Sequence, residues 1–221
     1  MRTVIAGGHG QIALHLERLL AARGHTPVGL IRNPAQSDDL RAAGAEPVVR
    51  DLESSTVEEV AAALAGADAA VFAAGAGPGS GAGRKETVDR AAAVLFADAA
   101  ELAGVRRFVV VSSMGADREP APGTDPVFAG YLRAKAAADA DITARKGLDW
   151  TILRPGALTD GPATGRVRLA PSTGRGSVPR ADVAAVLAAL LDTPATSGLT
   201  LELIGGEVPI QEAVAAAAGS S

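Results

Sequence analysis

The chain has one tyrosine, Tyr131, and it stands four residues before Lys135, one of three lysines in 221 residues. In a helix this spacing places both side chains on one face, one turn apart. An ammonium group beside a phenol favours the phenolate, so such a tyrosine can give or take a proton at a substrate oxygen. Chance would place one of the three lysines at this spacing only about once in seventy cases. The pair is therefore a candidate for proton-transfer chemistry.

Two hydroxyl groups, those of Ser112 and Ser113, follow three consecutive valines near the end of an expected strand. A hydroxyl at the carboxyl end of a strand can polarise a substrate carbonyl. Serines at this place are explained more simply by the end of the strand. Alone, they indicate no reaction.

The stretch GGHGQIA, which begins at Gly7, lies between a short apolar run and a segment with helical periodicity. Gly7, Gly10 and Ala13 have the spacing GxxGxxA, which provides a tight turn, close backbone approach to a pyrophosphate, and close packing of helix on strand. A helix starting near Gln11 would direct its unpaired amides and positive dipole end at that anion. Gln11 and Ile12 stand where a P-loop needs Lys and Ser or Thr, which disfavours a nucleoside triphosphatase. The stretch predicts a dinucleotide site, and a tight turn without ligand is the alternative.

The end of the second expected strand, Ile31-Arg32-Asn33-Pro34, has no carboxylate before Asp38. An acidic residue at this place would accept a hydrogen bond from the ribose 2′-hydroxyl of NAD(H). Arg32 can instead form charge-assisted hydrogen bonds with a 2′-phosphate. We therefore expect NADP(H) as the preferred cofactor, with NAD(H) as the alternative. The competing interpretation of Arg32 is an ordinary solvated side chain.

Asp51 follows the third expected strand. Its carboxylate is placed to accept a hydrogen bond from the adenine amino group. It could equally cap the next helix, although Ser54 or Ser55 is the better candidate for that cap.

Short β-branched or apolar runs alternate with longer amphipathic segments along the chain, which predicts a doubly wound parallel sheet covered by helices on both faces. The expected strands are Thr3–Ala6, Pro27–Ile31, Glu46–Arg50, Ala69–Ala73, Arg107–Ser112, Trp150–Leu153 and Leu199–Ile204. Helices are expected near 11–23, 35–43, 56–65, 86–103, 128–146, 180–192 and 209–218. A left-handed glycine is expected at the end of a helix at Gly24, Gly44, Gly66, Gly104 and Gly147. Two segments rich in Gly, Pro, Ser and Thr, 74–84 and 155–177, are expected as irregular loops at the carboxyl edge of the sheet, where α/β proteins bind ligands.

Bulk composition predicts one globular domain over residues 1–221, in which 155–221 contribute the substrate-side loop and the C-terminal elements. The absence of cysteine excludes disulfides, thiolate metal sites and a cysteine nucleophile. A net charge of −4 with scattered arginines gives no footprint for nucleic acid, and the three histidines have no spacing that suggests a metal. The sequence has no apolar run long enough to span a membrane and no signal-like start, so we expect a cytoplasmic protein. We expect its partner to be a small-molecule substrate, and the chain to be a monomer or a homodimer.

Taken together, these motifs resemble the short-chain dehydrogenase/reductase superfamily, specifically its atypical NAD(P)H-binding branch of NmrA-like and epimerase-like members. The resemblance covers nearly the whole chain and rests on GGHGQIA, IRNP, Asp51-Leu52, VFAAG at 71–75, TVD at 87–89, residues 108–115, Tyr131 with Lys135, LRPG at 153–156, and VPRADVA at 178–184. It departs from the superfamily's pattern at Ala13, which replaces the third glycine. The superfamily's helix asparagine also has no clear counterpart in TVD.

The resemblance implies a Rossmann-type fold in which Tyr131 exchanges a proton with the substrate oxygen, Lys135 holds the nicotinamide ribose and Ser113 orients the carbonyl. It also implies that the backbone of 155–158 borders the nicotinamide. The cofactor-binding positions expected from the motifs and the resemblance together are Gly7, Gly10, Gln11, Ile12, Arg32, Asn33, Asp51, Leu52, Ala73, Ala74, Gly75, Pro155, Gly156, Ala157 and Leu158.

The function expected is that of an NADP(H)-dependent oxidoreductase or epimerase acting on a small carbonyl or hydroxyl compound. The alternative is a non-catalytic NADP(H)-binding sensor, in which the segments 74–84 or 155–177 rearrange for a partner protein. A sensor has no need of the Tyr/Lys spacing, which favours the enzyme.

Overall fold

The computed structural model describes residues 1–75 and 85–219. The strands of these residues are β1 (Arg2–Ala6), β2 (Thr26–Ile31), β3 (Glu46–Val49), β4 (Ala69–Phe72), β5 (Arg107–Val111), β6 (Asp149–Pro155), β7 (Ala157–Thr159), β8 (Arg166–Ala170), β9 (Ser177–Pro179), β10 (Leu199–Gly205) and β11 (Val208–Pro209). Helices are α1 (Gln11–Ala22), α2 (Ser37–Ala42), α3 (Val57–Leu64), the π-helical η2 (Lys85–Ala91), α5 (Ala92–Leu102), α6 (Pro126–Ala144), α7 (Arg180–Leu191) and α8 (Ile210–Ala218), with 3₁₀ turns η1 (Pro34–Gln36) and η3 (Pro194–Thr196).

Within the described residues, the main sheet has nine strands in the order β11-β8-β10-β6-β5-β4-β1-β2-β3, and β7 pairs with β9 in a second, parallel pair. The strands from β10 to β3 run parallel, whereas β8 is antiparallel to both β10 and β11. The stretch from β3 to β6 has the order 3-2-1-4-5-6 of the Rossmann fold. The predicted doubly wound parallel sheet is confirmed.

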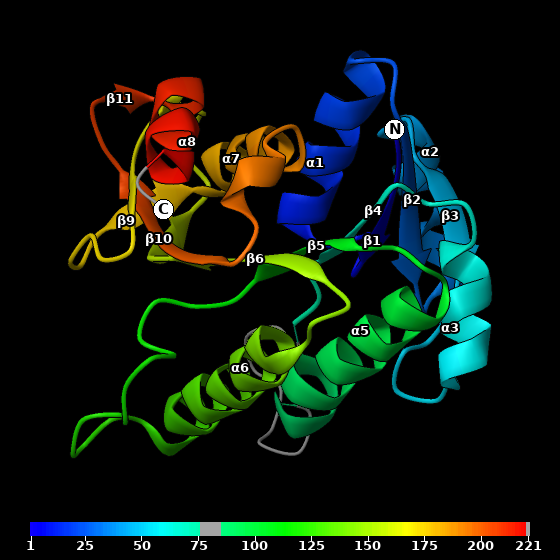
Figure 1. Ribbon diagram of the computed structural model, residues 1–221, viewed down its shortest axis with the longest axis horizontal. Coiled ribbons are helices and arrows are strands. Elements are labelled where there is room, and N and C mark those ends of the chain that lie inside the picture. The colour runs from blue at the N-terminus through cyan, green and yellow to red at the C-terminus, as the bar shows by residue number, and fades with distance from the viewer. Residues whose placement is uncertain (76–84, 220–221) are drawn as a thin grey trace.

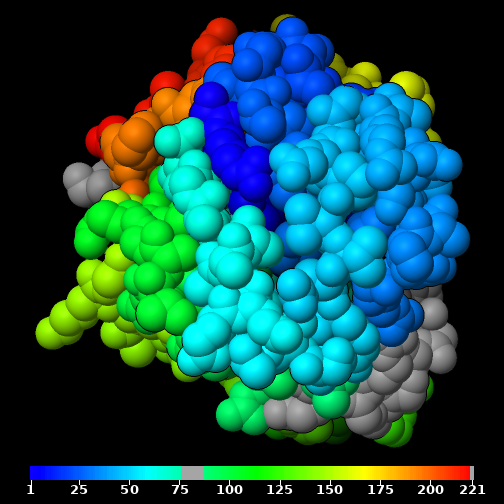
Figure 2. Space-filling view, turned by 90° about the vertical axis from the view of Figure 1, so that its right-hand side faces the viewer, coloured from blue at the N-terminus to red at the C-terminus, as the bar shows by residue number. Residues whose placement is uncertain are grey.

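The sheet separates two hydrophobic layers (Figure 1). On one face α1, α7 and α8 cover a core that includes Leu16, Val109 and Leu187. On the other, α3, α5 and α6 cover a core built around Phe96 and many alanines. Figure 2 looks onto the β3 end of the sheet, where residues of α2 in light blue and of α3 in cyan form much of the surface.

Alanines are numerous in the core that α3, α5 and α6 cover, and three aromatic side chains meet at its centre. Phe96 lies 6.1 Å from Phe72 and 5.7 Å from Phe108 between ring centroids, in tilted arrangements. All three are fully buried. They fill the space between α5 and the central strands that alanines alone would leave empty.

Most of the predicted helix ends are confirmed. Gly24, Gly44, Gly66 and Gly104 have φ between 70° and 80° directly after their helices. The expectation for Gly147 is wrong, because it is not among the glycines of positive φ and α6 leaves its last turn through Arg145 in an extended conformation. An added side chain at this glycine would meet only the carboxylate end of the exposed Glu101 side chain.

The segment 155–177 is not the irregular loop that its composition predicted, because it contains β7, β8 and the start of β9. The alternation in Arg166-Val167-Arg168-Leu169 is the sequence signal for β8, and Val167 is fully buried on the main sheet. Of the other segment, 74–84, only Ala74 and Gly75 belong to the described residues. No helix within the described residues is long and apolar enough to span a membrane.

The strand order reverses between β1 and β4, which lie side by side at the centre of the sheet. After β1 the chain passes to α1 on one face, and after β4 it reaches η2 and α5 on the other. The connections that follow the carboxyl ends of the two strands therefore diverge to opposite faces of the sheet. In α/β proteins such a switch point forms the crevice that receives ligands.

Candidate functional site

The glycine turn after β1 lies at this switch point. Gly7 has φ of +78°, and a side chain there would come within 2.7 Å of the Ala74 Cα on the neighbouring strand end. The Gly10 N–H donates to the Gly7 carbonyl at 2.8 Å, which closes the turn. Gly10 then caps α1 without a side-chain hydrogen bond, and the first turn of α1 carries no acidic residue. This helix end presents backbone amides without a competing anion of its own, as a phosphate site requires.

A cavity of about 310 Å³ opens beside the turn. The strand ends of β1 to β4 supply most of its wall, and η2 and α5 supply Val88 and Ala92. Eight of the predicted cofactor positions line it: Gly7, Gly10, Arg32, Asp51, Leu52, Ala73, Ala74 and Gly75. Sequence analysis missed His9, Leu30, Ile31, Gln36, Arg50, Glu53, Val88 and Ala92. Several of these residues are chain neighbours of predicted positions. The sequence therefore predicted the strand ends that form the site, but not every residue on them.

Three of the predicted positions near the turn do not line the cavity. Gln11 is exposed on the first turn of α1, whereas Ile12 packs against the hydrophobic core. The Asn33 side chain accepts a hydrogen bond from the Ala35 N–H and so caps the turn η1. The structure gives Asn33 and Ile12 structural contacts, and their assignment to the cofactor stays a prediction.

The predicted nicotinamide border, residues 155–158, also lies outside this cavity. The Gly156 N–H donates to Leu203 and the Ala157 N–H donates to Gly176, each at 2.9 Å. A side chain at Gly156 would overlap the Gly176 carbonyl. The two hydrogen bonds join the main sheet to the β7–β9 pair. This close approach of two backbone segments explains the glycine at position 156.

The interpretation of the residues around Asp51 is corrected in one respect. Neither Ser54 nor Ser55 caps α3, because the Thr56 hydroxyl oxygen accepts a hydrogen bond from the Glu59 N–H and the Glu59 carboxylate accepts one from the Thr56 N–H. This reciprocal capping box satisfies two amides at once, which a single serine further from the helix could not do. The Asp51 side chain, free of the cap, accepts the Glu53 N–H at 3.0 Å and lines the cavity.

Three basic side chains line the same end of the cavity, and each meets a carboxylate. The Arg32 guanidinium lies 3.4 Å from Glu53, Arg50 lies 3.6 Å from Glu59, and His9 Nε2 lies 2.7 Å from Asp39. Although no acid follows Arg32 closely in the chain, the fold brings Glu53 to it from the loop after β3.

The structure confirms that Tyr131 and Lys135 share one face of α6. The Lys135 ammonium lies 5.9 Å from the centroid of the Tyr131 ring. It is buried, donates to the Val111 carbonyl at 3.2 Å and lies 3.3 Å from the carboxylate of Asp89. The half-buried Tyr131 stacks on Phe128, with ring centroids 5.9 Å apart. Asp89 is the last residue of the TVD motif, which has no clear counterpart of the superfamily's asparagine. In the fold its carboxylate pairs with the Lys135 ammonium.

The two serines after β5 differ in their surroundings. Ser112 is buried and donates to Asp139 at 2.8 Å, and the Arg154 guanidinium binds the same carboxylate at 2.9 Å. Burial raises the pKa of Asp139, against the opposing effect of Ser112 and Arg154. Ser113 is half-buried and donates only to the adjacent Met114 carbonyl, at 3.3 Å. Ser113 is therefore the serine that is able to turn its hydroxyl toward a substrate.

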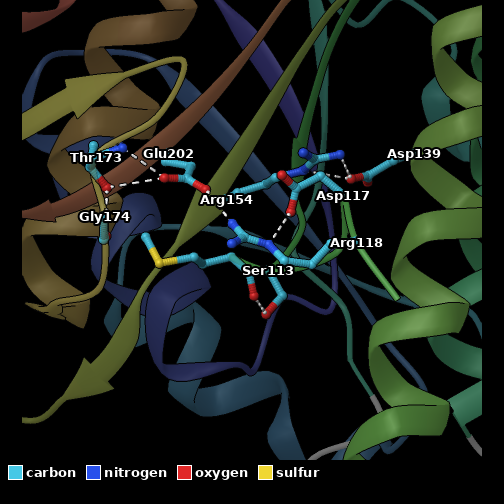
Figure 3. A network of polar contacts seen from close by, with 9 residues as sticks. Ser113, Asp117, Arg118, Asp139, Arg154, Thr173, Gly174 and Glu202 are labelled. Carbon is cyan, nitrogen blue, oxygen red and sulfur yellow. Dashed lines mark hydrogen bonds and ion pairs between the residues drawn. The ribbon is translucent and has the colours of Figure 1, made fainter. Parts of the chain in front are cut away.

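A second polar group faces Ser113 across the carboxyl edge of the sheet (Figure 3). Glu202 on β10 is buried, and one of its oxygens accepts the Thr173 N–H at 2.7 Å. Its other oxygen lies 3.6 Å from the exposed guanidinium of Arg118, which also pairs with Asp117. Arg118 thus reaches the neighbourhood of Ser113 (Figure 3).

The sequence and the fold both match known proteins. The NAD(P)H-binding family matches residues 7–194. The chain is 37% identical over 215 residues to YhfK of Bacillus subtilis, named an uncharacterized sugar epimerase, with 97% of this chain and 99% of that protein covered. A solved structure from Bacillus halodurans, provisionally described as an NAD-dependent epimerase/dehydratase, has a TM-score of 0.90 at 37% identity, covering 98% of this chain and 99% of that one. The oxidoreductase ylbE of Lactococcus lactis has a TM-score of 0.87 at 29% identity, covering 98% and 96%. The resemblance found in the sequence is confirmed, and the chain belongs to the NAD(P)H-binding family.

Proposed function

We propose that this protein is an NADP(H)-dependent oxidoreductase or epimerase acting on a small carbonyl or hydroxyl compound. The observation that carries the proposal is the cavity at the switch point of the sheet, which joins the glycine turn to the Arg32 side chain. Relatives named as an oxidoreductase and a sugar epimerase support the same class of reaction.

The residues around the cavity fit a dinucleotide. The amides at the start of α1 suit a pyrophosphate, and Gly7 allows the turn before them to lie directly against Ala74. Asp51 can accept from the adenine amino group, and Arg32 can bind a 2′-phosphate with charge-assisted hydrogen bonds. A bound dinucleotide would supply the hydride that is exchanged with the substrate carbon.

Tyr131 is the proposed proton donor and acceptor at the substrate oxygen. The Lys135 ammonium lies 5.9 Å from the centroid of the Tyr131 ring, on the same face of α6, which is the arrangement that the Tyr/Lys proposal needs. Ser113 is the proposed hydrogen-bond donor that orients the substrate carbonyl. Ser112 is excluded from that role because its hydroxyl is already engaged with Asp139.

One observation favours the alternative of a non-catalytic sensor. The Lys135 ammonium is already held by Val111 and Asp89 inside the protein, so the lysine has a structural role that does not depend on turnover. A panel of aldehydes, ketones and sugars assayed with NADPH distinguishes the two functions. A sensor binds NADPH with one-to-one stoichiometry and consumes none of it across the panel.

The variant Tyr131→Phe tests the catalytic proposal on any substrate that the panel yields. We expect turnover to fall by at least about 100-fold, as for loss of a general acid–base group, while NADPH affinity changes less than about twofold. Equal turnover by the variant and the wild type would show that Tyr131 does not carry the proton. NADPH fluorescence measures the affinity in the same samples.

A further inference from the structure

We propose that Glu53 is a specificity-determining residue that competes with a 2′-phosphate for Arg32 and so limits the preference for NADP(H) over NAD(H). The inference rests on the proposed function, since it concerns the adenosine end of the same dinucleotide site. Glu53 lies in the loop after β3, outside the end of β2 where the cofactor preference was expected to be determined.

The fold holds the Glu53 carboxylate in place from several elements. One oxygen lies 3.4 Å from the Arg32 guanidinium, and the other accepts the Thr87 hydroxyl at 2.7 Å. The Glu53 N–H donates to Asp51 at 3.0 Å, which fixes the backbone beneath the side chain. Its side chain is 26% exposed, against 55% for Arg32. These contacts therefore hold the carboxylate in one position on the cavity wall, unlike that of a solvated surface acid.

Glu53 also differs from the other carboxylates that pair with the basic side chains of the cavity. Glu59 and Asp39 bind their partners from outside the cavity, whereas Glu53 is itself part of the lining. A ligand group that reaches Arg32 through the cavity thus also meets Glu53. The other two acids can stay paired while the cavity is filled.

The chemistry of a carboxylate separates the two dinucleotides. A ribose 2′-hydroxyl can donate a hydrogen bond to Glu53 while Arg32 keeps its ion pair. A 2′-phosphate dianion must share Arg32 with Glu53 and is repelled by the carboxylate across a few ångströms. Glu53 therefore supports NAD(H) binding and weakens NADP(H) binding, whereas Arg32 acts in the opposite direction.

The test compares dissociation constants of NADPH and NADH, measured by nucleotide fluorescence, for the wild type and Glu53→Gln. Glutamine keeps the size of the side chain and an oxygen for the Thr87 hydroxyl but removes the charge. Removal of one like charge at this range predicts about 5- to 10-fold tighter NADPH binding at low salt, with NADH binding unchanged or a few-fold weaker. The gain should shrink in high salt, because the repulsion is screened.

Glu58→Gln is the matched control, since it removes the same charge from an exposed position on α3 that does not line the cavity. We expect it to change both constants less than about twofold. An unchanged NADH-to-NADPH ratio in Glu53→Gln, or an equal tightening for both nucleotides, would overturn the inference while leaving the proposed function intact. Failure of the wild type to bind either nucleotide would instead overturn the proposed function, and the inference with it.

Discussion

A buried carboxyl group beneath the glycine turn gives the protein a measurable dependence of stability on pH. Glu17 lies on α1, is fully buried, and its oxygens reach no hydrogen-bond donor in the described residues. One oxygen lies so close to Gly8 and Gly29 that a side chain at either glycine would press against it. Burial raises the pKa of Glu17 from 4.5 to about 8, and the charge of Arg18 only partly opposes this. The carboxyl is therefore neutral in the folded protein at pH 7.

The sign and size of the effect follow from the two protonation states. Between pH 4.5 and about 8 the folded protein keeps the Glu17 proton, whereas the unfolded chain loses it. Stability therefore falls as pH rises, by about 1.4 kcal/mol per pH unit, and the full window costs on the order of 5 kcal/mol. At pH 7 the cost is about 3 kcal/mol, and above pH 8 it no longer grows.

The variant Glu17→Met removes the titrating group and keeps an unbranched side chain of similar length. We expect it to be about 3 kcal/mol more stable than the wild type at pH 7, and to lose most of the wild-type slope between pH 5 and 8. Urea unfolding at pH 5, 6, 7 and 8, followed by the fluorescence of Trp150, the one tryptophan of the chain, measures both quantities. Glu212→Gln, an exposed carboxylate on α8, is the control and should keep the wild-type slope. Parallel pH curves for wild type and Glu17→Met would refute the reasoning.

Three further variants test the local structure. Thr56→Ala should lower the free energy of urea unfolding by about 1 kcal/mol through loss of the α3 cap, whereas Ser55→Ala should change it by less than about 0.5 kcal/mol; equal effects would contradict the cap assignment. Ser112→Ala should cost about 2 kcal/mol of stability because it removes a buried hydrogen bond to a carboxyl group, while Ser113→Ala should leave stability within about 0.5 kcal/mol and reduce turnover; the reverse pattern in unfolding and activity assays would exchange their roles. Gly7→Ala should cost at least about 2 kcal/mol and abolish NADPH binding in a fluorescence titration, because an alanine there needs a left-handed backbone and overlaps the neighbouring strand end.

Local sequence patterns predicted the features that depend on neighbouring residues. The alternation of strand and helix gave the parallel sheet, and the spacing of Gly7 and Gly10 gave the turn at its switch point. Helical periodicity placed Tyr131 and Lys135 on one face, as observed. Each of these conclusions needs only residues within about two turns or one strand of each other.

Contacts between distant segments could not be predicted in this way. Glu53 meets Arg32 across 21 residues and Thr87 across 34, and Asp139 meets Ser112 across 27. Whether two such residues meet depends on the order of the strands and on the residue at which each strand ends. A single sequence does not determine either of these. The alternation that marks β8 is short and lies among glycines and prolines, whose composition is typical of an irregular loop.

Titration calorimetry of the purified protein with NADPH and NADH tests the central claim most directly, because the backbone amides at the start of α1 should bind the pyrophosphate that both nucleotides contain. We expect saturable binding of one nucleotide per chain, with NADPH the tighter ligand and Arg32→Ala reducing its advantage over NADH by about 10-fold or more. Absence of binding heat for both nucleotides at millimolar concentrations, confirmed by unchanged nucleotide fluorescence, would contradict the account.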